Sequence, residues 1–307
     1  MTLNELRYVV ALARERHFGR AAASCFVSQP TLSVAVKKLE EELGSPLFER
    51  ASSDITLTPL GEAVVVHAQS ILERVESIRH LAQGHADPLH GVLRLGAIYT
   101  VGPYLLPQLI PNLHTLAPHM PLQIEEGFTA DLRRRLKQGE LDAILVALPF
   151  DEAGIEVRPL YEEPFVALLP ASHPLIGQPE IPLAALAGEE LLLLGSGHCL
   201  RDQILSACPE CARAQSSGQM GETPLAGSSL ETLRHMVASG LGVTVLPCTA
   251  AGAEHYAGRL VTVRRLAEPV PHRCVALAWR SGFPRQAAID TLAQAILSAP
   301  MSCVKPC

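Results

Sequence analysis

The sequence lacks any hydrophobic run that could cross a membrane, since a transmembrane helix needs about 18 consecutive apolar residues. The segment from Met1 to Arg7 also lacks the basic stretch and following apolar stretch that mark a signal peptide. Charged residues are scarce at 18%, whereas hydrophobic residues reach 48%, a balance typical of folded globular proteins rather than disordered ones. We therefore expect a cytoplasmic protein, whose 307 residues suit two or three units with their own cores.

An overall excess of positive charge is also absent, because the net charge is −6 at pH 7. This balance argues against a protein that coats nucleic acid without sequence preference. Residues 1–39 nevertheless hold six basic and two acidic side chains, a local balance of +4. A small basic module on an acidic body is typical of sequence-specific DNA-binding proteins.

The spacing of hydrophobic residues predicts three helices at the N-terminus. An amphipathic helix is expected over residues 2–14, and a short second helix begins at Arg20. Ser28 is expected to cap a third helix that ends at Gly44, with Pro30 in its first turn, where a missing N–H costs little.

The start of the third helix carries candidate DNA-binding side chains. This end of a recognition helix normally enters the major groove, so Gln29, Thr31 and Ser33 are expected near base edges or phosphates. A plain helical hairpin with a capped second helix is the other interpretation of the same spacing.

Two short extended runs follow, residues 47–50 and 55–58, and they predict a β-hairpin wing. From Pro59 an apolar stripe with helical spacing continues to Leu81. This stripe predicts a helical linker that pairs with a second copy of the chain.

After residue 88, strand-like runs alternate with helical segments, which predicts a parallel sheet with helices on both faces. Segments 156–164 and 264–271 are expected to cross between two lobes, and two lobes joined by two crossings leave a cleft for a ligand or reactive site. The expected divisions are a winged helix-turn-helix domain at 1–58, a linker helix at 59–88, a regulatory domain at 89–300 and a tail at 301–307. Within the regulatory domain, lobe I comprises 89–162 and 269–300, and lobe II comprises 163–268.

Five short motifs carry a resemblance to a known family. They are residues 18–22, 28–33, 38–44, 47–50 and 57–61. In this pattern residues 1–61 resemble the winged helix-turn-helix of LysR-type transcriptional regulators, and the resemblance extends over essentially the whole chain. The resemblance implies a two-lobed α/β effector domain that is similar to periplasmic binding proteins. It also implies a transcriptional activator that is a homodimer or homotetramer and binds promoter DNA and RNA polymerase. The residues that it places on DNA are Gln29, Pro30, Thr31, Ser33, Lys37 and, on the wing at the DNA backbone, Arg50.

Eight cysteines stand at positions 25, 199, 208, 211, 248, 274, 303 and 307. In a reducing cytoplasm we expect them to be thiols, and any disulfide there is more often regulatory or catalytic than structural. Cys303 and Cys307 follow Pro300, and we expect them to be disordered and without a role.

Cys199 combines several features of a reactive thiol. The glycine-rich loop 195–197 follows the apolar run 191–194, and the residues after it have helical spacing, so Cys199 is expected in the first turn of a helix. A helix N-terminus with a neighbouring histidine, here His198, stabilises a thiolate and favours nucleophilic attack.

Cys208 is the candidate partner of Cys199. In a continuous helix the α-carbons of these residues would lie about 13 Å apart along the axis, whereas a disulfide needs about 4.4–6.8 Å. A bond between them would therefore melt the helix and act as a conformational switch. The alternatives are two unrelated thiols, or a metal site that includes Cys211, although a lone Cys-x-x-Cys motif is weak evidence for zinc.

The segment 195–208 also resembles the OxyR family of peroxide sensors among the LysR-type regulators. The resemblance implies that Cys199 reacts with hydrogen peroxide and Cys208 resolves the product, with thioredoxin- or glutaredoxin-type reductants and no cofactor or metal. Cys211 departs from the family pattern, which leaves open whether Cys208 or Cys211 resolves the product, and Cys208 is the favoured one. The further residues that the resemblance places around the peroxide are Thr100, Thr129, His198, Asp202 and Arg273. Both threonines follow predicted strands, where open α/β sheets place their sites.

Three functions are compatible with these features. The favoured one is a peroxide-sensing regulator of antioxidant-defence genes, which is not an enzyme. The second is a LysR-type regulator that binds a small metabolite in the interlobe cleft. The third, a thiol peroxidase with an appended DNA-binding domain, ranks lowest because the DNA-binding motif occupies the entire N-terminus.

Overall fold

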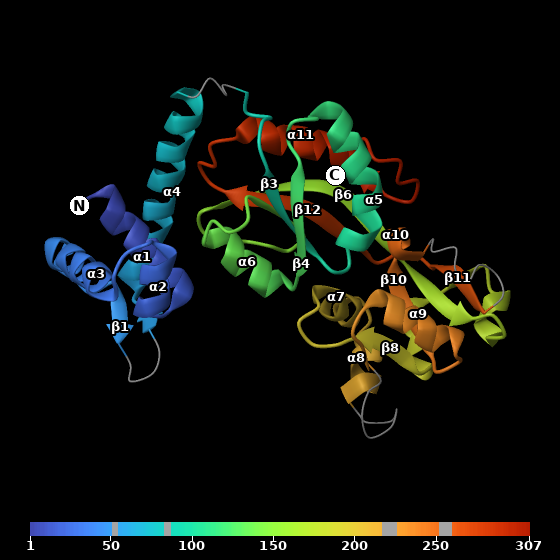
Figure 1. The fold of residues 1–307 in the computed structure, drawn as a ribbon. Coiled ribbons are helices and arrows are strands. Elements are labelled where there is room, and N and C mark those ends of the chain that lie inside the picture. Colours follow the sequence, from blue (N-terminus) through green and yellow to red (C-terminus); the bar gives the residue numbers. More distant parts are fainter. Residues whose placement is uncertain (51–54, 83–86, 217–225, 252–259) are drawn as a thin grey trace.

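The computed structural model describes residues 1–50, 55–82, 87–216, 226–251 and 260–307 (Figure 1). The buried hydrophobic side chains of these residues form three clusters, one in the N-terminal segment and one in each of two α/β lobes. Within the described ranges, no helix is both long and apolar enough to span a membrane.

The three N-terminal helices pack around a shared hydrophobic core, in which Leu32 and Leu39 of the third helix, α3, are fully buried. At the start of α1 the Thr2 hydroxyl accepts from the backbone N–H of Glu5, and the Glu5 carboxylate accepts from that of Thr2, so both free donors are satisfied. Gly44 ends α3 in a left-handed conformation with φ of 71°. The helices are α1 (Leu3–Glu15), α2 (Phe18–Ser24) and α3 (Gln29–Leu43), as the spacing predicts.

The predicted wing is an antiparallel pair of strands, β1 (Phe48–Arg50) and β2 (Ile55–Leu57), while its tip at 51–54 lies outside the described residues. Thr58 starts the following helix, α4 (Pro59–Ala82), because its hydroxyl accepts from the Gly61 N–H at 2.9 Å and donates to the Pro46 carbonyl. A Cβ at Gly61 would lie 2.0 Å from the Leu47 carbonyl oxygen, so only glycine fits against the wing.

Lobe I is built on a mixed sheet in the order β4-β3-β5-β12-β6. Strands β3, β4 and β5 run parallel, but β12 is antiparallel to both β5 and β6, so the expectation of a purely parallel sheet is wrong. Strand β12 returns from lobe II and enters the sheet from the opposite end, so it alone of these five strands runs in the reverse direction. The elements are β3 (Leu93–Ile98), α5 (Gly102–Leu116), β4 (Leu122–Gly127), α6 (Thr129–Lys137), β5 (Ala143–Ala147), β12 (His272–Arg280) and α11 (Gln286–Leu297).

Strand β6 (Ile155–Pro170) joins the two lobes as one continuous strand, and its first half occupies the predicted crossing at 156–164. This half pairs with β12 in lobe I, while the second half pairs with β10 and β11 in lobe II. The other strands of lobe II are β7 (Glu180–Ile181), β8 (Leu191–Leu194), β9 (Ala226–Gly227), β10 (Val243–Pro247) and β11 (Val261–Leu266). Its helices are α7 (Cys199–Ala207), α8 (Pro209–Ser216), α9 (Leu230–Ala238), α10 (Cys248–Ala251) and the short η1 (Pro174–Gly177) and η2 (Leu183–Gly188).

The C-terminal tail is ordered, which corrects the expectation that its cysteines are disordered. Strand β13 (Lys305–Pro306) pairs antiparallel with β6 opposite Glu162 and Tyr161. The Cys307 backbone N–H donates to the Leu160 carbonyl at 3.2 Å. The tail thus adds a short edge strand to the sheet, because β6 still offers backbone groups there.

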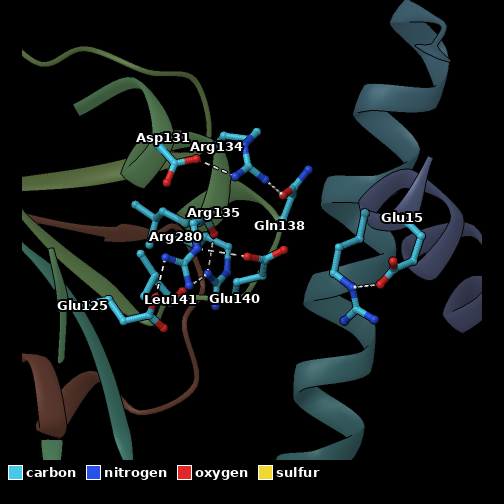
Figure 2. A network of polar contacts seen from close by, with 11 residues as sticks. Glu15, Glu125, Asp131, Arg134, Arg135, Gln138, Glu140, Leu141 and Arg280 are labelled. Atoms are coloured by element: carbon cyan, nitrogen blue, oxygen red, sulfur yellow. Dashed lines mark hydrogen bonds and ion pairs between the residues drawn. The ribbon is translucent and has the colours of Figure 1, made fainter. Parts of the chain in front are cut away.

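Hydrogen bonds and ion pairs of two arginines, Arg135 and Arg280, connect α6 to the sheet of lobe I (Figure 2). Arg280 is only 7% exposed and donates to the carbonyls of Leu136 and Leu141 at 2.5 and 2.6 Å. Beside it, Arg135 pairs with Glu125 at 2.6 Å and with Glu140 at 3.0 Å. These contacts join the end of α6 to β4 and β12.

We predict that Arg280→Met lowers the free energy of unfolding by about 2–3 kcal/mol, because hydrogen bonds from a charged donor to buried carbonyls are lost. Arg134→Met is the matched control, since Arg134 pairs with Asp131 on the surface, and it should cost less than about 1 kcal/mol. Urea denaturation of both variants measures the difference. Equal losses would contradict a structural role for the buried contacts.

Candidate functional site

The loop 195–198 presents Cys199 at the start of α7. Gly197 has a φ of 95°, which favours glycine, and a Cβ there would lie 3.3 Å from the ring of Phe128. His198 is the N-cap residue and Cys199 the first residue of the helix, so the predicted placement in the first turn is confirmed. Cys199 is a half-buried free thiol that packs against the core of lobe I, although its helix belongs to lobe II.

A cavity of about 10 Å³ adjoins this thiol. It is lined by Thr100, Thr129, His198 and Cys199, together with the aromatic rings of Tyr99 and Phe128. A space of this size accepts about one water-sized molecule. Thr100 lies in the turn after β3, and Thr129 begins α6 just after β4, so the structure brings together four of the predicted site residues.

Aromatic rings enclose His198, which is 7% exposed. The ring centroid of Phe128 lies 4.8 Å from that of His198 in an edge-on arrangement, and Tyr99 lies 6.0 Å away. Burial lowers the pKa of His198 below its ordinary value, although a backbone hydrogen bond with Ser228 opposes this. The imidazole is therefore favoured in its neutral form, which can accept a proton but does not supply positive charge to a thiolate.

Arg273 is buried rather than on the surface, with 2% exposure. It donates to the Thr100 hydroxyl and to the Thr100 carbonyl, each at 2.8 Å, and to the Glu163 carboxylate at 2.7 Å. Glu163 is fully buried and also accepts from the backbone N–H and hydroxyl of Thr249. Arg273 thus acts on the small cavity by positioning Thr100.

Glu163 and Gln203 were missed by the sequence analysis. Glu163 stands beside another glutamate in β6, and no local pattern distinguishes the buried one from the exposed one. Gln203 lies on α7 and donates to the Leu148 carbonyl of lobe I at 3.1 Å, which connects the helix that carries Cys199 to the opposite lobe.

Asp202 does not line the small cavity beside Cys199. It is exposed in the first turn of α7 and lines a wider cleft of about 1010 Å³, which Cys199 and Arg273 also reach. Asp202 therefore faces the open side of the thiol rather than the small cavity.

Cys208 caps the C-terminal end of α7 and is bonded to Cys211 of α8. Both residues are 1% exposed, and their sulfur atoms lie within 3.8 Å of the Leu183 carbonyl oxygen. Helix α7 is intact, so Cys199 and Cys208 stand at its opposite ends. Cys208, the expected partner of Cys199, is therefore already bonded to Cys211 in this structure.

Four of the predicted DNA-binding residues, Gln29, Pro30, Thr31 and Ser33, lie in the first turns of α3, and Lys37 lies further along the same helix. The Ser28 hydroxyl caps the helix by accepting from the Thr31 N–H at 3.3 Å. Gln29, Pro30, Thr31 and Lys37 are exposed, with Lys37 3.6 Å from Glu41, whereas Ser33 is half-buried. The side chain of Arg50 lies outside the described part of the structure.

Two exposed apolar side chains near the start of α3 were not predicted. Phe26 is 96% exposed with a φ of 57°, and Val34 is 68% exposed. Exposed apolar side chains beside a polar helix start suit contact with a thymine methyl group.

The winged helix-turn-helix, the long helix α4 and the two lobes define the class of LysR-type transcriptional regulators. Residues 3–62 match the family described as "Bacterial regulatory helix-turn-helix protein, lysR family", and residues 86–300 match the "LysR substrate binding domain". The chain belongs to the LysR family, and OxyR proteins are among its similar relatives within that family.

The similarity to these relatives runs over nearly the whole chain. The "DNA-binding transcriptional dual regulator OxyR" of Escherichia coli K12 is 42% identical, over 96% of this chain and 95% of its own. The "Probable hydrogen peroxide-inducible genes activator" of Streptomyces viridosporus is 44% identical, over 97% and 94%. The solved structure of a full-length OxyR variant from Pseudomonas aeruginosa is 55% identical, covers 97% of this chain and 98% of its own, and superposes with a TM-score of 0.80.

We predict that His198 makes the folded protein sensitive to acid. Because the pKa of His198 is lowered in the folded protein, the unfolded chain binds a proton at this residue at a higher pH than the folded protein does. The contribution of neutral His198 to the free energy of unfolding is therefore complete above the ordinary histidine pKa of about 6.5 and is lost as the pH falls through the folded-state pKa. A His198→Asn variant should therefore lose less unfolding free energy than the wild type between about pH 7 and pH 5. Urea denaturation across this range measures it, with His272→Asn at an exposed position as control. Parallel curves for the wild type and His198→Asn would refute the effect.

Proposed function

We propose that this protein is a cytoplasmic transcriptional regulator that senses hydrogen peroxide through Cys199 and controls antioxidant-defence genes. The observation that carries the proposal is the placement of a free thiol at a helix N-terminus, beside a water-sized cavity with two threonines and a neutral imidazole. Names such as "hydrogen peroxide-inducible genes activator", borne by relatives more than 40% identical to this chain, support it.

In the proposed reaction the Cys199 thiolate attacks one oxygen of hydrogen peroxide. The O–O bond breaks, the hydroxide that leaves takes a proton to become water, and Cys199 becomes a sulfenic acid. Neutral His198 can take the thiol proton, and the hydroxyls of Thr100 and Thr129 can donate to the peroxide oxygens. Arg273 holds Thr100, and Asp202 lies on the side from which reactant enters.

Cys208 is proposed to resolve the sulfenic acid, which forms a Cys199–Cys208 disulfide and releases water. This step requires α7 to unwind, and it requires Cys208 to be free of Cys211. Cys211 could then displace Cys199 from Cys208, which would return Cys199 as a thiol and leave a Cys208–Cys211 bond. Thioredoxin- or glutaredoxin-type proteins would reduce the final disulfide.

The N-terminal segment is proposed to bind promoter DNA through the start of α3. Residues 1–58 would form the DNA-binding domain, 59–88 the linker and 89–300 the regulatory domain, divided into lobes as the sequence indicates. Exposed apolar side chains on α4, among them Val66, Ile71 and Ile78, suit pairing with a second copy into a dimer or tetramer. RNA polymerase is the proposed further partner.

The protein is proposed to act as a regulator and not as a peroxidase. The similar relatives are named as DNA-binding regulators and activators. A sensor consumes a fixed, small number of peroxide equivalents per chain, whereas a peroxidase with a thiol reductant consumes peroxide continuously. Because a dithiol can also reduce the disulfide of a sensor, the rate of consumption is the measurement: with excess dithiol a peroxidase should consume peroxide far faster than the dithiol alone, whereas a sensor should add little to that background.

We predict that Cys199→Ser keeps the DNA footprint of the reduced protein after peroxide, because no other thiol has the same environment. Cys208→Ser should accumulate sulfenic acid at position 199 without the stable oxidised footprint. Footprinting and mapping of disulfide-linked peptides measure both results. A dominant 199–211 linkage would transfer the resolving role to Cys211. A normal peroxide response in Cys199→Ser would overturn the mechanism and favour a metabolite as signal.

We predict that Gln29→Ala and Ser33→Ala each weaken binding to the operator by about 1–3 kcal/mol, the usual cost of one lost base contact. Thr115→Ala on α5 is the control, since its exposed side chain lies far along the chain in lobe I. Fluorescence anisotropy with operator DNA measures the affinity. Unchanged affinity in both variants would remove these residues from the DNA interface.

A further inference from the structure

Four further cysteines form two close pairs at the C-terminal tail, residues 300–307, and one of them, Cys274, also lines the wide cleft that Cys199 reaches. Cys248 and Cys303 are bonded to each other, although 55 positions separate them in the sequence. The sulfur atom of Cys274 lies 3.0 Å from that of Cys307. Half of the cysteines of the chain are thus brought together by one short segment.

The backbone of the tail places these pairs. Strand β13 pairs with β6, and the Cys307 N–H donates to the Leu160 carbonyl. Met301 and Val304 pack against the core of lobe I. The tail is therefore seated on the sheet by contacts that do not depend on sulfur, which keeps each pair of thiols close together.

The two pairs lie on different lobes. Cys248 begins α10 directly after β10 of lobe II, whereas Cys274 belongs to β12 of lobe I. The tail between Cys303 and Cys307 passes along β6, the strand common to both lobes. Bonds at both positions would fasten the tail across the junction of the lobes.

Each pair also adjoins one partner of the buried ion pair that holds Thr100. Cys248 directly precedes Thr249, which donates to Glu163, and Cys274 directly follows Arg273. The positions of the tail cysteines are therefore linked through the backbone to the small cavity beside Cys199.

We propose that the tail is a second thiol switch, in which reversible Cys248–Cys303 and Cys274–Cys307 disulfides fasten residues 300–307 across the two lobes. Hydrogen peroxide is the oxidant. One thiolate of each pair attacks a peroxide oxygen, which gives a sulfenic acid and water, and the second thiol displaces a second water as the disulfide forms. A dithiol reductant supplies the two electrons that restore each pair.

The environment of the sulfurs sets the order of these steps. Cys303 and Cys307 are exposed, whereas Cys248 and Cys274 are half-buried. Burial and the hydrogen bond with Cys307 raise the pKa of Cys274 to about 12, so Cys274 stays protonated. The exposed tail thiols therefore react first, and the half-buried thiols resolve them.

The test uses full-length protein that carries Cys199→Ser, so that the tail is measured apart from the sensor thiol. The protein is reduced, treated with hydrogen peroxide, alkylated and digested without reductant. Peptides linked between 248 and 303 and between 274 and 307 should appear and should vanish after dithiothreitol. Tail cysteines that remain free, or that pair otherwise, would overturn the proposal while leaving the proposed function of Cys199 untouched.

Trypsin leaves Cys303 and Cys307 in one peptide, because the only basic residue after Arg285 is Lys305, and trypsin does not cleave before the proline that follows it. Single variants are therefore needed to assign the two pairs. Cys303→Ser should abolish the linkage to Cys248 and keep the linkage to Cys274, and Cys307→Ser should do the reverse. Cys25→Ser, in the N-terminal core, should keep both linkages. Loss of both linkages in either tail variant would contradict two independent pairs.

Hydrogen exchange measures whether the bonds fasten the lobes. Oxidation should slow amide exchange in residues 158–164, 248–251 and 272–275 of the Cys199→Ser protein. The double variant Cys303→Ser/Cys307→Ser in the same background should show no such slowing. Equal amide exchange in the oxidised and the reduced protein would overturn the proposal that the disulfides fasten the tail across the two lobes, even if the disulfides form.

Discussion

The buried ion pair between Arg273 and Glu163 is the contact on which the arrangement of the effector domain depends. Removing two charges from water costs several kcal/mol per ion unless hydrogen bonds saturate both groups. Here Thr100 and Thr249 provide those bonds. Since Arg273 lies on β12 and Glu163 on β6, one polar cluster joins the two strands near the junction of the lobes, the end of β3 and the start of α10.

Cys199 lies at the boundary between the two lobes. Thr100 and Thr129 come from lobe I, whereas His198 and Cys199 come from lobe II, and Cys199 packs into the core of lobe I. Further contacts cross the same boundary, from Gln203 to the Leu148 carbonyl and from the Tyr104 hydroxyl to Glu231. A chemical change at Cys199 that moves α7 must therefore disturb the contact between lobes, which is how a local reaction can reach the rest of the molecule.

The cysteines divide into groups with different surroundings. Cys199 is a lone thiol at a helix start, while Cys208 and Cys211 are buried and bonded at the junction of α7 and α8. The tail cysteines sit at the edge of β6. An intact α7 keeps the first group apart from the second, so the helix itself decides which thiols can meet.

Local signals in the sequence determined the three N-terminal helices and their caps, the wing, the start of α7 at Cys199 and the strand ends before Thr100 and Thr129. Each depends on residues within a few positions of one another. Only the tertiary structure decided the antiparallel direction of β12, the burial of Arg273 against a glutamate 110 residues away, and the seat of the tail on β6. Such contacts follow from how distant segments pack, which hydrophobic periodicity and capping residues do not encode.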